Sequence, residues 1–349
     1  MADQEVVDLA SLVKRVNDET KTNLLHLAGE GVNEVTQWIP TGWTLLDLAL
    51  CGGIPMGRLI ELFGLESSGK STVCYQVLRN VQRAGGVAIY FDVENTYQRQ
   101  LAQKMGIDTD RLIVVQDGLL LDGDRSAFSY ISSIMKALRS EEPTAPLVIV
   151  WDTIAATLTK GEKDGDASAA LGPYRARIIR EGLRTLPSKM AAANTSLILV
   201  NHVGVKINSG GPGGGWGGPQ YDTSGGRGPK YYASVRIGLR VGSLIKNDAE
   251  VPVGQEIVAK VEKLKLGAPR REAKGRLYFG DGIDDAYSLF DYLKDAGVIK
   301  QSGAWSQIPS PSGAVVKTYP SKLREALAAN PGLYEHMQKL ATEKFESDT

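Results

Sequence analysis

The stretch of sequence that decides the fold is Gly64-Leu-Glu-Ser-Ser-Gly-Lys-Ser71, which fits the pattern G-x-x-x-x-G-K-[ST] at every fixed position. An apolar segment of strand length, Arg58 to Phe63, precedes it, and Thr72 to Arg83 follows with valines at four-residue spacing. The predicted order is strand, glycine-rich loop and helix. Glycines let backbone N–H groups turn toward phosphate oxygens, and the helix N-terminus adds positive partial charge. A nucleotide site is predicted here; the alternative is a Gly/Ser turn that happens to hold a lysine.

The pattern also predicts a role for single residues of this loop. Lys70 is expected to reach the β and γ phosphates of ATP, and the Ser71 hydroxyl to bind Mg²⁺. The residues expected to contact the nucleotide in this stretch are Gly64, Leu65, Glu66, Ser67, Ser68, Gly69, Lys70, Ser71 and Thr72.

Composition limits what the rest of the chain can be. Of its 349 residues, 42% are apolar and 23% are charged, which is ordinary for a globular protein of two or three domains. Lysine plus arginine (40) equals aspartate plus glutamate (40), so a site for a polyanion has to be a local patch. The neutral balance does not exclude DNA.

Cysteine usage and the N-terminus favour a cytoplasmic protein. Cys51 and Cys74 are the two cysteines, and they lack metal-ligand spacing, which suits a reducing compartment better than a disulfide framework. The acidic start of the chain has no apolar signal core, and no run of about eighteen apolar residues occurs. No membrane partner is expected.

Strand-like and helix-like segments alternate after the loop. Apolar runs of strand length occupy residues 86–92, 111–115, 146–152 and 195–201, and helices are predicted at 98–105 and 126–139. This alternation is typical of an α/β fold with a mostly parallel central sheet.

Acidic residues follow two of these strands, at the sheet edge where parallel α/β proteins bind ligands. Glu94 is the candidate general base for the water that attacks the γ-phosphate. The alternative is a helix N-cap pair, with Asp92 or Asn95 as cap and Glu94 in the first turn. Asp152 ends the run Pro146 to Asp152 in the Walker B pattern, so it is expected on the Mg²⁺ side of the site.

Two loops differ from the rest in composition. Residues 159–172 are polar and lead to a predicted helix on which Arg177, Arg180 and Arg184 share a face. Residues 204–228 hold eleven glycines and include Trp216, a possible stacking group for a nucleic acid. Such a loop suits a sugar-phosphate backbone as ligand, and the alternative is an insertion without a role.

Two lysines stand close together near the end of an alternating segment. Lys263 and Lys265 are predicted to leave the same face of a strand that pairs with residues 230–240. Either they form an anion site, or they protect a solvated edge strand from pairing with another chain.

The two ends of the chain form separate expected domains. Asp8 to Glu19 carries the apolar stripe of an amphipathic helix, too short to be stable without a packing partner. We expect residues 1–38 to be an N-terminal segment whose helix packs on its own body or on another subunit, 39–280 the nucleotide-binding core and 281–349 a small C-terminal α+β domain.

These motifs together resemble the RecA recombinase family from about Thr41 to Trp305. They arrive in the family's order: Gly52 to Arg58, Gly64 to Ser71, Phe91 to Glu94, Trp151-Asp152, Leu199 to His202, Thr223 to Gly226, Tyr232 to Arg236, Lys263 to Lys265 with Pro269, and Gly303 to Trp305. The resemblance implies a DNA-dependent ATPase that forms helical filaments on single-stranded DNA and exchanges strands with a homologous duplex. It also implies roles in recombination, DNA repair and the SOS response, with single-strand binding and loader proteins as partners.

The resemblance assigns roles to residues of this chain. It places Glu94 on the catalytic glutamate, Asp152 on the Walker B aspartate, and Lys263 and Lys265 on the pair that reaches the neighbouring subunit's γ-phosphate. The two loops fall on the family's DNA-binding loops, and the N-terminal helix falls on the element that docks on the next subunit. The implied DNA contacts are Arg177, Arg184, Trp216, Gly225 and Gly226.

Some positions depart from the bacterial pattern of the family. His202 stands where bacterial members have the γ-phosphate-sensing glutamine, and phage-type members resemble this chain there. Leu101 stands where a tyrosine stacks on adenine, so the nucleotide preference is open; Gln98 and Leu101 are still expected beside the nucleotide. The second loop is longer, and the acidic C-terminal tail is nearly absent. Rival functions are a hexameric helicase of the same core fold and an ATP-gated single-stranded DNA scaffold without strand exchange.

Overall fold

The computed structural model describes residues 8–30, 34–116, 118–142, 144–165, 171–205, 221–223 and 226–348. The chain divides into two compact units, Met1–Thr36 and Gln37–Thr349. In the first unit, α1 (Leu9–Thr20) begins at Asp8, whose carboxylate accepts hydrogen bonds from the N–H groups of Ala10 and Ser11. Leu9 and Leu12 of its apolar stripe are exposed. None of the helices in the described ranges has the length and apolarity that crossing a membrane requires.

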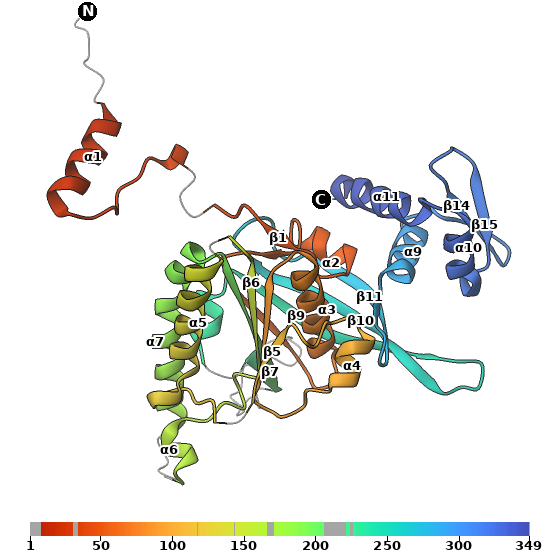
Figure 1. Ribbon diagram of the computed structural model, residues 1–349. Coiled ribbons are helices and arrows are strands. Elements are labelled where there is room, and N and C mark those ends of the chain that lie inside the picture. The colour runs from red at the N-terminus through yellow and green to blue at the C-terminus, as the bar shows by residue number, and fades with distance from the viewer. Residues whose placement is uncertain are drawn as a thin grey trace, which may run out of the picture. The chain divides into compact units, whose positions relative to one another are not determined.

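The second unit is built on a large twisted sheet (Figure 1). Six neighbouring strands, from β9 to β5 in spatial order, run parallel, and β10, β11 and β12 extend this sheet with antiparallel pairing. In spatial order the strands are β12 (Gly282–Asp284), β11 (Glu272–Tyr278), β10 (Pro252–Leu264), β9 (Val235–Lys246), β3 (Leu59–Gly64), β7 (Thr195–Val205), β6 (Leu147–Asp152), β4 (Val87–Asp92) and β5 (Leu112–Val115), with β8 (Tyr221–Thr223) paired to β7. The predicted α/β class with a mostly parallel sheet is confirmed.

Helices cover both faces of the parallel part (Figure 1). One face packs against α2 (Thr44–Ala49), α3 (Lys70–Arg83) and α4 (Arg99–Lys104). The other face packs against α5 (Ala127–Glu141) and α7 (Leu171–Ala192). Because side chains alternate between the two faces of a strand, each central strand contributes to both cores. Every residue of β6 is buried, which explains its continuous apolar run.

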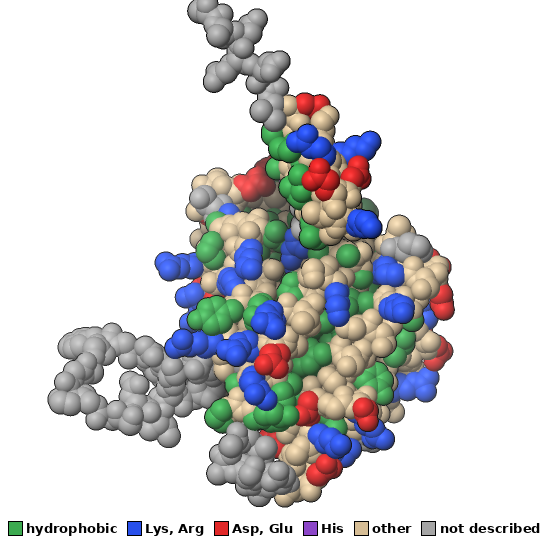
Figure 2. Space-filling model, turned by 90° about the vertical axis from the view of Figure 1, so that its left-hand side faces the viewer, with side chains coloured by type: hydrophobic (Ala, Val, Ile, Leu, Met, Phe, Trp, Pro, Cys, Tyr) green, Lys and Arg blue, Asp and Glu red, His purple; other side chains and the backbone are tan. Residues whose placement is uncertain are grey.

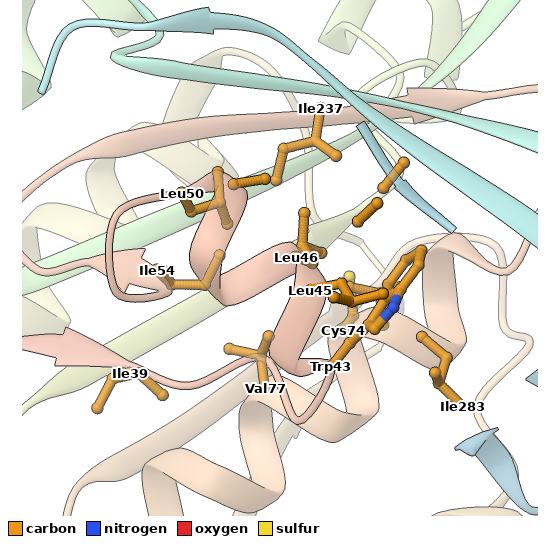
Figure 3. Close-up of a cluster of buried hydrophobic side chains, with 14 of the residues drawn as sticks. Ile39, Trp43, Leu45, Leu46, Leu50, Ile54, Cys74, Val77, Ile237 and Ile283 are labelled. Atoms are coloured by element: carbon orange, nitrogen blue, oxygen red, sulfur yellow. The ribbon is translucent and has the colours of Figure 1, made fainter. Parts of the chain in front are cut away.

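The core beside the phosphate loop is shown in Figure 3. Trp43, Leu45 and Leu46 at the start of α2 lie against Cys74 and Val77 of α3, and all five side chains are almost inaccessible to solvent. This packing fixes α3, whose N-terminus carries the phosphate loop.

The basic segment from Pro269 to Arg276 leads into β11, which begins at Glu272. Its inward positions include Ala273 and Gly275, so the alternation carries little apolar signal. Gly275 faces the indole of Trp43 so closely that a Cβ would lie 2.7 Å from the ring. The small residue is needed because the indole fills the space that a side chain would take.

The C-terminal part is mixed α and β, as expected, and β12 lies just past the boundary expected at residue 280. Its other elements are α9 (Asp285–Asp295), β13 (Lys300–Ser302), β14 (Trp305–Pro309), β15 (Val315–Thr318), α10 (Leu323–Ala329) and α11 (Leu333–Ser347). Asp285 joins it to α2 by accepting hydrogen bonds from the Thr44 N–H (2.6 Å), the Thr44 hydroxyl (2.7 Å) and the Tyr334 hydroxyl (2.6 Å). Burial raises the pKa of the Asp285 carboxyl.

The remaining elements are short. They are β1 (Trp38–Ile39), β2 (Ile54–Pro55), α6 (Lys160–Lys163), α8 (Gly228–Tyr232) and the 3-10 helices Ala28–Glu30, Gly123–Arg125 and Pro320–Lys322.

Candidate functional site

The carboxyl ends of four parallel strands meet at one edge of the sheet. Strand register places Gly64 of β3 opposite His202 of β7, and Asp92 of β4 opposite Asp152 of β6. A cavity of about 450 Å³ opens at this edge. Its lining residues are Glu66, Ser67, Ser68, Gly69, Lys70, Ser71, Thr72, Glu94, Thr96, Asp152, His202, Gln255, Leu277 and Phe279.

The phosphate loop has the conformation that its glycines and serines predict. Ser67 has φ 57° and Gly69 has φ 89°, in the left-handed region, and Gly69 precedes the first residue of α3. The Lys70 ammonium donates hydrogen bonds to the carbonyls of Gly64 (3.1 Å) and Leu65 (2.7 Å). Burial lowers the pKa of Lys70, and the nearby carboxylates of Asp152 and Glu94 oppose this shift.

The phosphate loop fits a triphosphate on two grounds. The Ser68 hydroxyl oxygen is buried and, among the described residues, has no hydrogen-bond partner, which leaves it available to a ligand. The Lys70 ammonium donates hydrogen bonds to two main-chain carbonyls, and phosphate oxygens could accept these hydrogen bonds in their place.

Ser71 and Asp152 form the candidate magnesium position. The Ser71 hydroxyl donates to Asp152 Oδ2 over 2.8 Å, and the Tyr90 hydroxyl donates to the same oxygen over 2.6 Å. Burial raises the pKa of Asp152, and these two hydrogen bonds oppose the shift. A hydroxyl and a carboxylate beside the phosphate loop are oxygen donors that suit Mg²⁺. The two residues that the sequence proposes for the metal are therefore in contact.

Glu94 lies in the cavity lining and not in a helix. Its Oε1 accepts a hydrogen bond from the Thr153 hydroxyl (2.8 Å) and lies 3.3 Å from Nε2 of His202. Asp92 caps the turn after β4, because its carboxylate accepts from the N–H groups of Thr96 and Tyr97, each over 2.9 Å. The alternative that placed Glu94 in the first turn of a helix is wrong, since α4 begins at Arg99.

The two residues expected near the nucleotide base are not in this lining. Leu101 is half-buried and packs against the core beneath α4, and Gln98 is exposed at the N-cap position of that helix. Gln255 of β10 and the pair Leu277 and Phe279 line the cavity instead. Phe279 is 49% exposed. Sequence reasoning missed these three residues because they come from β10, from β11 and from the turn after β11, far along the chain, and match no local motif.

The lysine pair lies at the other end of the same strands. In the sheet register, Lys263 lies opposite Arg236 of β9, and Arg236 lies opposite Glu61 of β3. The N–H of Lys265 donates to the Ser234 carbonyl, and the N–H of Ser234 donates to the Leu59 carbonyl. Since Leu59 begins β3 and Gly64 ends it, roughly 17 Å of strand separates the level of Lys265 from the phosphate loop. Strand β10 is paired on both sides over Gly254–Lys260, but at Lys263 its register partner is Arg236 of β9 alone, so the edge-strand alternative stays open at the lysine pair.

The surroundings of Lys263 are basic and partly buried. Its ammonium donates to the carbonyls of Lys230 (2.8 Å) and Tyr231 (3.0 Å). Burial lowers its pKa, and the positive charges of Lys265 and Arg236 lower it further. Arg236 bridges the fully buried Glu61 and the exposed Glu262, which holds the strands together behind the pair.

Helix α7 carries exposed arginines and also contacts the end of the glycine-rich second loop. Arg177, Arg180 and Arg184 are exposed on this helix. Gly226 lies so close to Ala176 that a Cβ on the glycine would be 3.3 Å from the alanine Cβ. The end of the second loop therefore touches the helix that follows the first. Figure 2 views the side that carries α5 and α7 and shows Lys and Arg side chains spread across it. Trp216 and Gly225 lie outside the described residues.

Comparison with known proteins agrees with this arrangement. The sequence model of the RecA N-terminal domain family matches residues 8–284. The protein named RecA from Bifidobacterium breve is 34% identical over 326 residues, which cover 93% of this chain and 78% of the relative. A RecA protein of Thermus thermophilus is 34% identical over 340 residues, covering 97% of this chain and 94% of the relative. Because the family model covers most of the chain and these relatives are 34% identical over nearly all of it, the chain belongs to the RecA family of recombinases.

Proposed function

We propose that this protein is a DNA-dependent ATPase that assembles into helical filaments on single-stranded DNA and exchanges strands with a homologous duplex. The observation that carries the proposal is the separation of two half-sites on one sheet. The phosphate loop with Asp152 and Glu94 lies at one end of the central strands, and Lys263 and Lys265 lie at the other. A nucleotide site of this kind is completed when one subunit's lysines meet the next subunit's phosphate loop.

The residues at the carboxyl edge of the sheet have separate roles in ATP hydrolysis. Lys70 and the loop N–H groups hold the phosphates, and Ser71 and Asp152 hold Mg²⁺, which neutralises charge on the phosphate oxygens when bound. Glu94 takes a proton from water as the water oxygen bonds to the γ-phosphorus. The bond from that phosphorus to the bridging oxygen breaks, and ADP leaves with its electron pair.

The interface role of the lysines gives ATP a structural task. Lys263 exchanges two main-chain carbonyls for phosphate oxygens of the neighbouring site, which gives a charge-assisted contact. The exposed stripe of α1, with Leu9 and Leu12, gains its partner by docking on another subunit. ATP therefore strengthens the filament, and hydrolysis weakens it.

DNA binding is coupled to the phosphate through His202. This residue contacts Glu94, and it belongs to β7, the strand that leads into the second loop. Arg177 and Arg184, with the two loops, hold the sugar-phosphate backbone, and base pairing supplies the choice of sequence. Trp216, Gly225 and Gly226 join this interface. A cytoplasmic role in recombination, repair and the SOS response follows, with single-strand binding and loader proteins as partners.

The test mixes two inactive variants. K70A loses the phosphate loop's lysine, and K263A/K265A loses the lysine pair, so each is expected to lose DNA-stimulated ATP turnover by about 10³-fold or more. In a mixture, some interfaces join an intact phosphate loop to an intact lysine pair. Turnover should then recover to a sizeable fraction of the wild-type value, read as phosphate release on single-stranded DNA.

Other outcomes separate the rivals. If K263A/K265A alone forms normal ATP-dependent filaments by electron microscopy, the lysines do not act across an interface. A closed six-membered ring with unwinding activity would identify a helicase. Binding of single-stranded DNA with ATP, but no product in a strand-exchange assay with homologous duplex, would identify a scaffold.

A further inference from the structure

Thr153 is a buried residue that the proposed mechanism has not used. It follows β6 directly, and its side chain is 1% exposed. Its hydroxyl donates a hydrogen bond of 2.8 Å to Oε1 of Glu94. Since Glu94 stands on the turn after β4 and is one-third exposed, this contact ties an accessible carboxylate to the buried core.

The direction of the Thr153 hydrogen bond is fixed by its surroundings. The N–H of Ala156 donates to the same hydroxyl oxygen over 3.1 Å. An amide N–H can only donate, so Oγ1 accepts there, and its own hydrogen is left for the carboxylate. Thr153 is therefore a committed donor to Glu94.

The backbone of Thr153 is held as firmly as its side chain. The Thr157 hydroxyl donates to the Thr153 carbonyl over 2.9 Å, and the Trp151 indole N–H donates to that hydroxyl over 2.8 Å. Trp151 and Thr157 are fully buried. Side chains locked by packing and hydrogen bonds in this way hold a reacting group within a narrow range of positions.

Both contacts to Glu94 fall on one of its oxygens. Thr153 donates to Oε1, and Nε2 of His202 lies 3.3 Å from the same atom. Across the described residues, Oε2 of Glu94 has no hydrogen-bond partner. One oxygen is thus anchored, and the other is left to face a ligand.

We propose that Thr153 is a positioning residue, whose hydroxyl anchors Oε1 of Glu94 so that Oε2 is presented to the attacking water. This inference rests on the proposed role of Glu94 as the general base. Because a misplaced reacting group loses rate more than substrate binding, removal of the hydroxyl lowers kcat and leaves KM for ATP nearly unchanged.

The experiment compares T153V, which keeps the shape without the hydroxyl, with T153S, which keeps the hydroxyl. Full-length protein is assayed for ATP turnover on single-stranded DNA. T153V should lose roughly 10- to 100-fold in kcat with KM changed by less than about threefold, and T153S should stay near wild type. T195V is the matched control, because it removes a fully buried hydroxyl that donates to the Ala193 carbonyl over 2.8 Å and touches neither Glu94 nor Thr153.

A double-mutant cycle separates positioning from general loosening. In single-turnover assays of E94Q protein, adding T153V should lower the rate little further, because the carboxylate that Thr153 anchors is already absent. Equal losses of rate in both backgrounds, an equal kcat loss in T195V, or a T153S loss as large as that of T153V would overturn the inference. If thermal melting shows that T153V is unfolded, T153A replaces it in the same cycle. Wild-type turnover in E94Q would instead reject Glu94 as the base.

Discussion

Lys70 and Lys263 stand at opposite ends of the central strands, and each donates to two main-chain carbonyls. Burial lowers the pKa of both ammonium groups. Their neighbours differ: Lys70 lies among the carboxylates of Asp152 and Glu94, whereas Lys263 lies beside the positive charges of Arg236 and Lys265. The first site has compensating charge within one chain, whereas the second would, under the proposed function, be completed by an anion from another subunit.

The same difference appears in the contacts around each lysine. At the phosphate loop, Ser71 is bonded to Asp152, and Glu94 to Thr153, so the reacting groups are already arranged. At the other end, Lys265 is exposed, and Glu61, the acidic group that acts on Lys263, is buried and paired with Arg236. A phosphate brought by a second subunit would satisfy both lysines. In the filament that we propose, this asymmetry would favour assembly in one direction, with each copy's lysines facing the next copy's nucleotide.

The largest effect, on ATP turnover, is expected from a substitution of Asp152 beside the phosphate loop. D152N removes the charge that faces Ser71 and should lower ATP turnover by about 100-fold, with a higher Mg²⁺ requirement, because metal-site supports of this kind cost 10- to 100-fold. The measurement is turnover against Mg²⁺ concentration. Y90F is the matched control: it removes the other hydrogen bond to the same oxygen and should cost much less. If both variants behave alike, Asp152 has only a structural role.

A smaller effect is expected from pH at the lysine end. The pKa of Lys263 is lowered in the single chain, and a neighbour's phosphate would raise it, so assembly takes up a proton when the pH exceeds the lowered value. ATP-dependent assembly should weaken as pH rises through that value, by at most about tenfold per pH unit. Light scattering against pH measures this. K263R, which stays charged, should flatten the profile, and an unchanged alkaline loss in K263R would place the titrating group elsewhere.

The smallest effect is expected at Gln255, where a strand of the antiparallel part supports the phosphate loop. Its side-chain amide donates to the Ser67 carbonyl over 2.7 Å. Q255A should raise KM for ATP about fivefold, equivalent to about 1 kcal/mol, because one hydrogen bond to the loop is lost. Q301A is the control, since it loses a 2.8 Å hydrogen bond to Ser306 in the small C-terminal sheet. Steady-state KM values decide, and equal values for Q255A and wild type would contradict the support role.

Much of the nucleotide site could be predicted because its signals are local. The phosphate loop occupies eight consecutive residues, and Asp152 ends an apolar run that is buried on both sides. The lysine pair could also be identified, but its two explanations stay open, because the pairing of β10 with β11 covers Gly254–Lys260 and does not reach Lys263. The places of Gln98 and Leu101 could not be settled, because a resemblance of position does not fix which way a helix turns its side chains.

By itself, the sequence determined the α/β class, the phosphate loop, and the carboxylates at the strand ends, since period and motif act over a few residues. Only the tertiary structure decided which distant groups meet: Thr153 with Glu94, 59 positions apart, and Gln255 with Ser67, 188 apart. The glycine in β11 has the same kind of cause, because Gly275 is explained by the indole of Trp43 that packs on it. Such contacts depend on how strands align across the sheet, and no short pattern in the chain encodes that alignment.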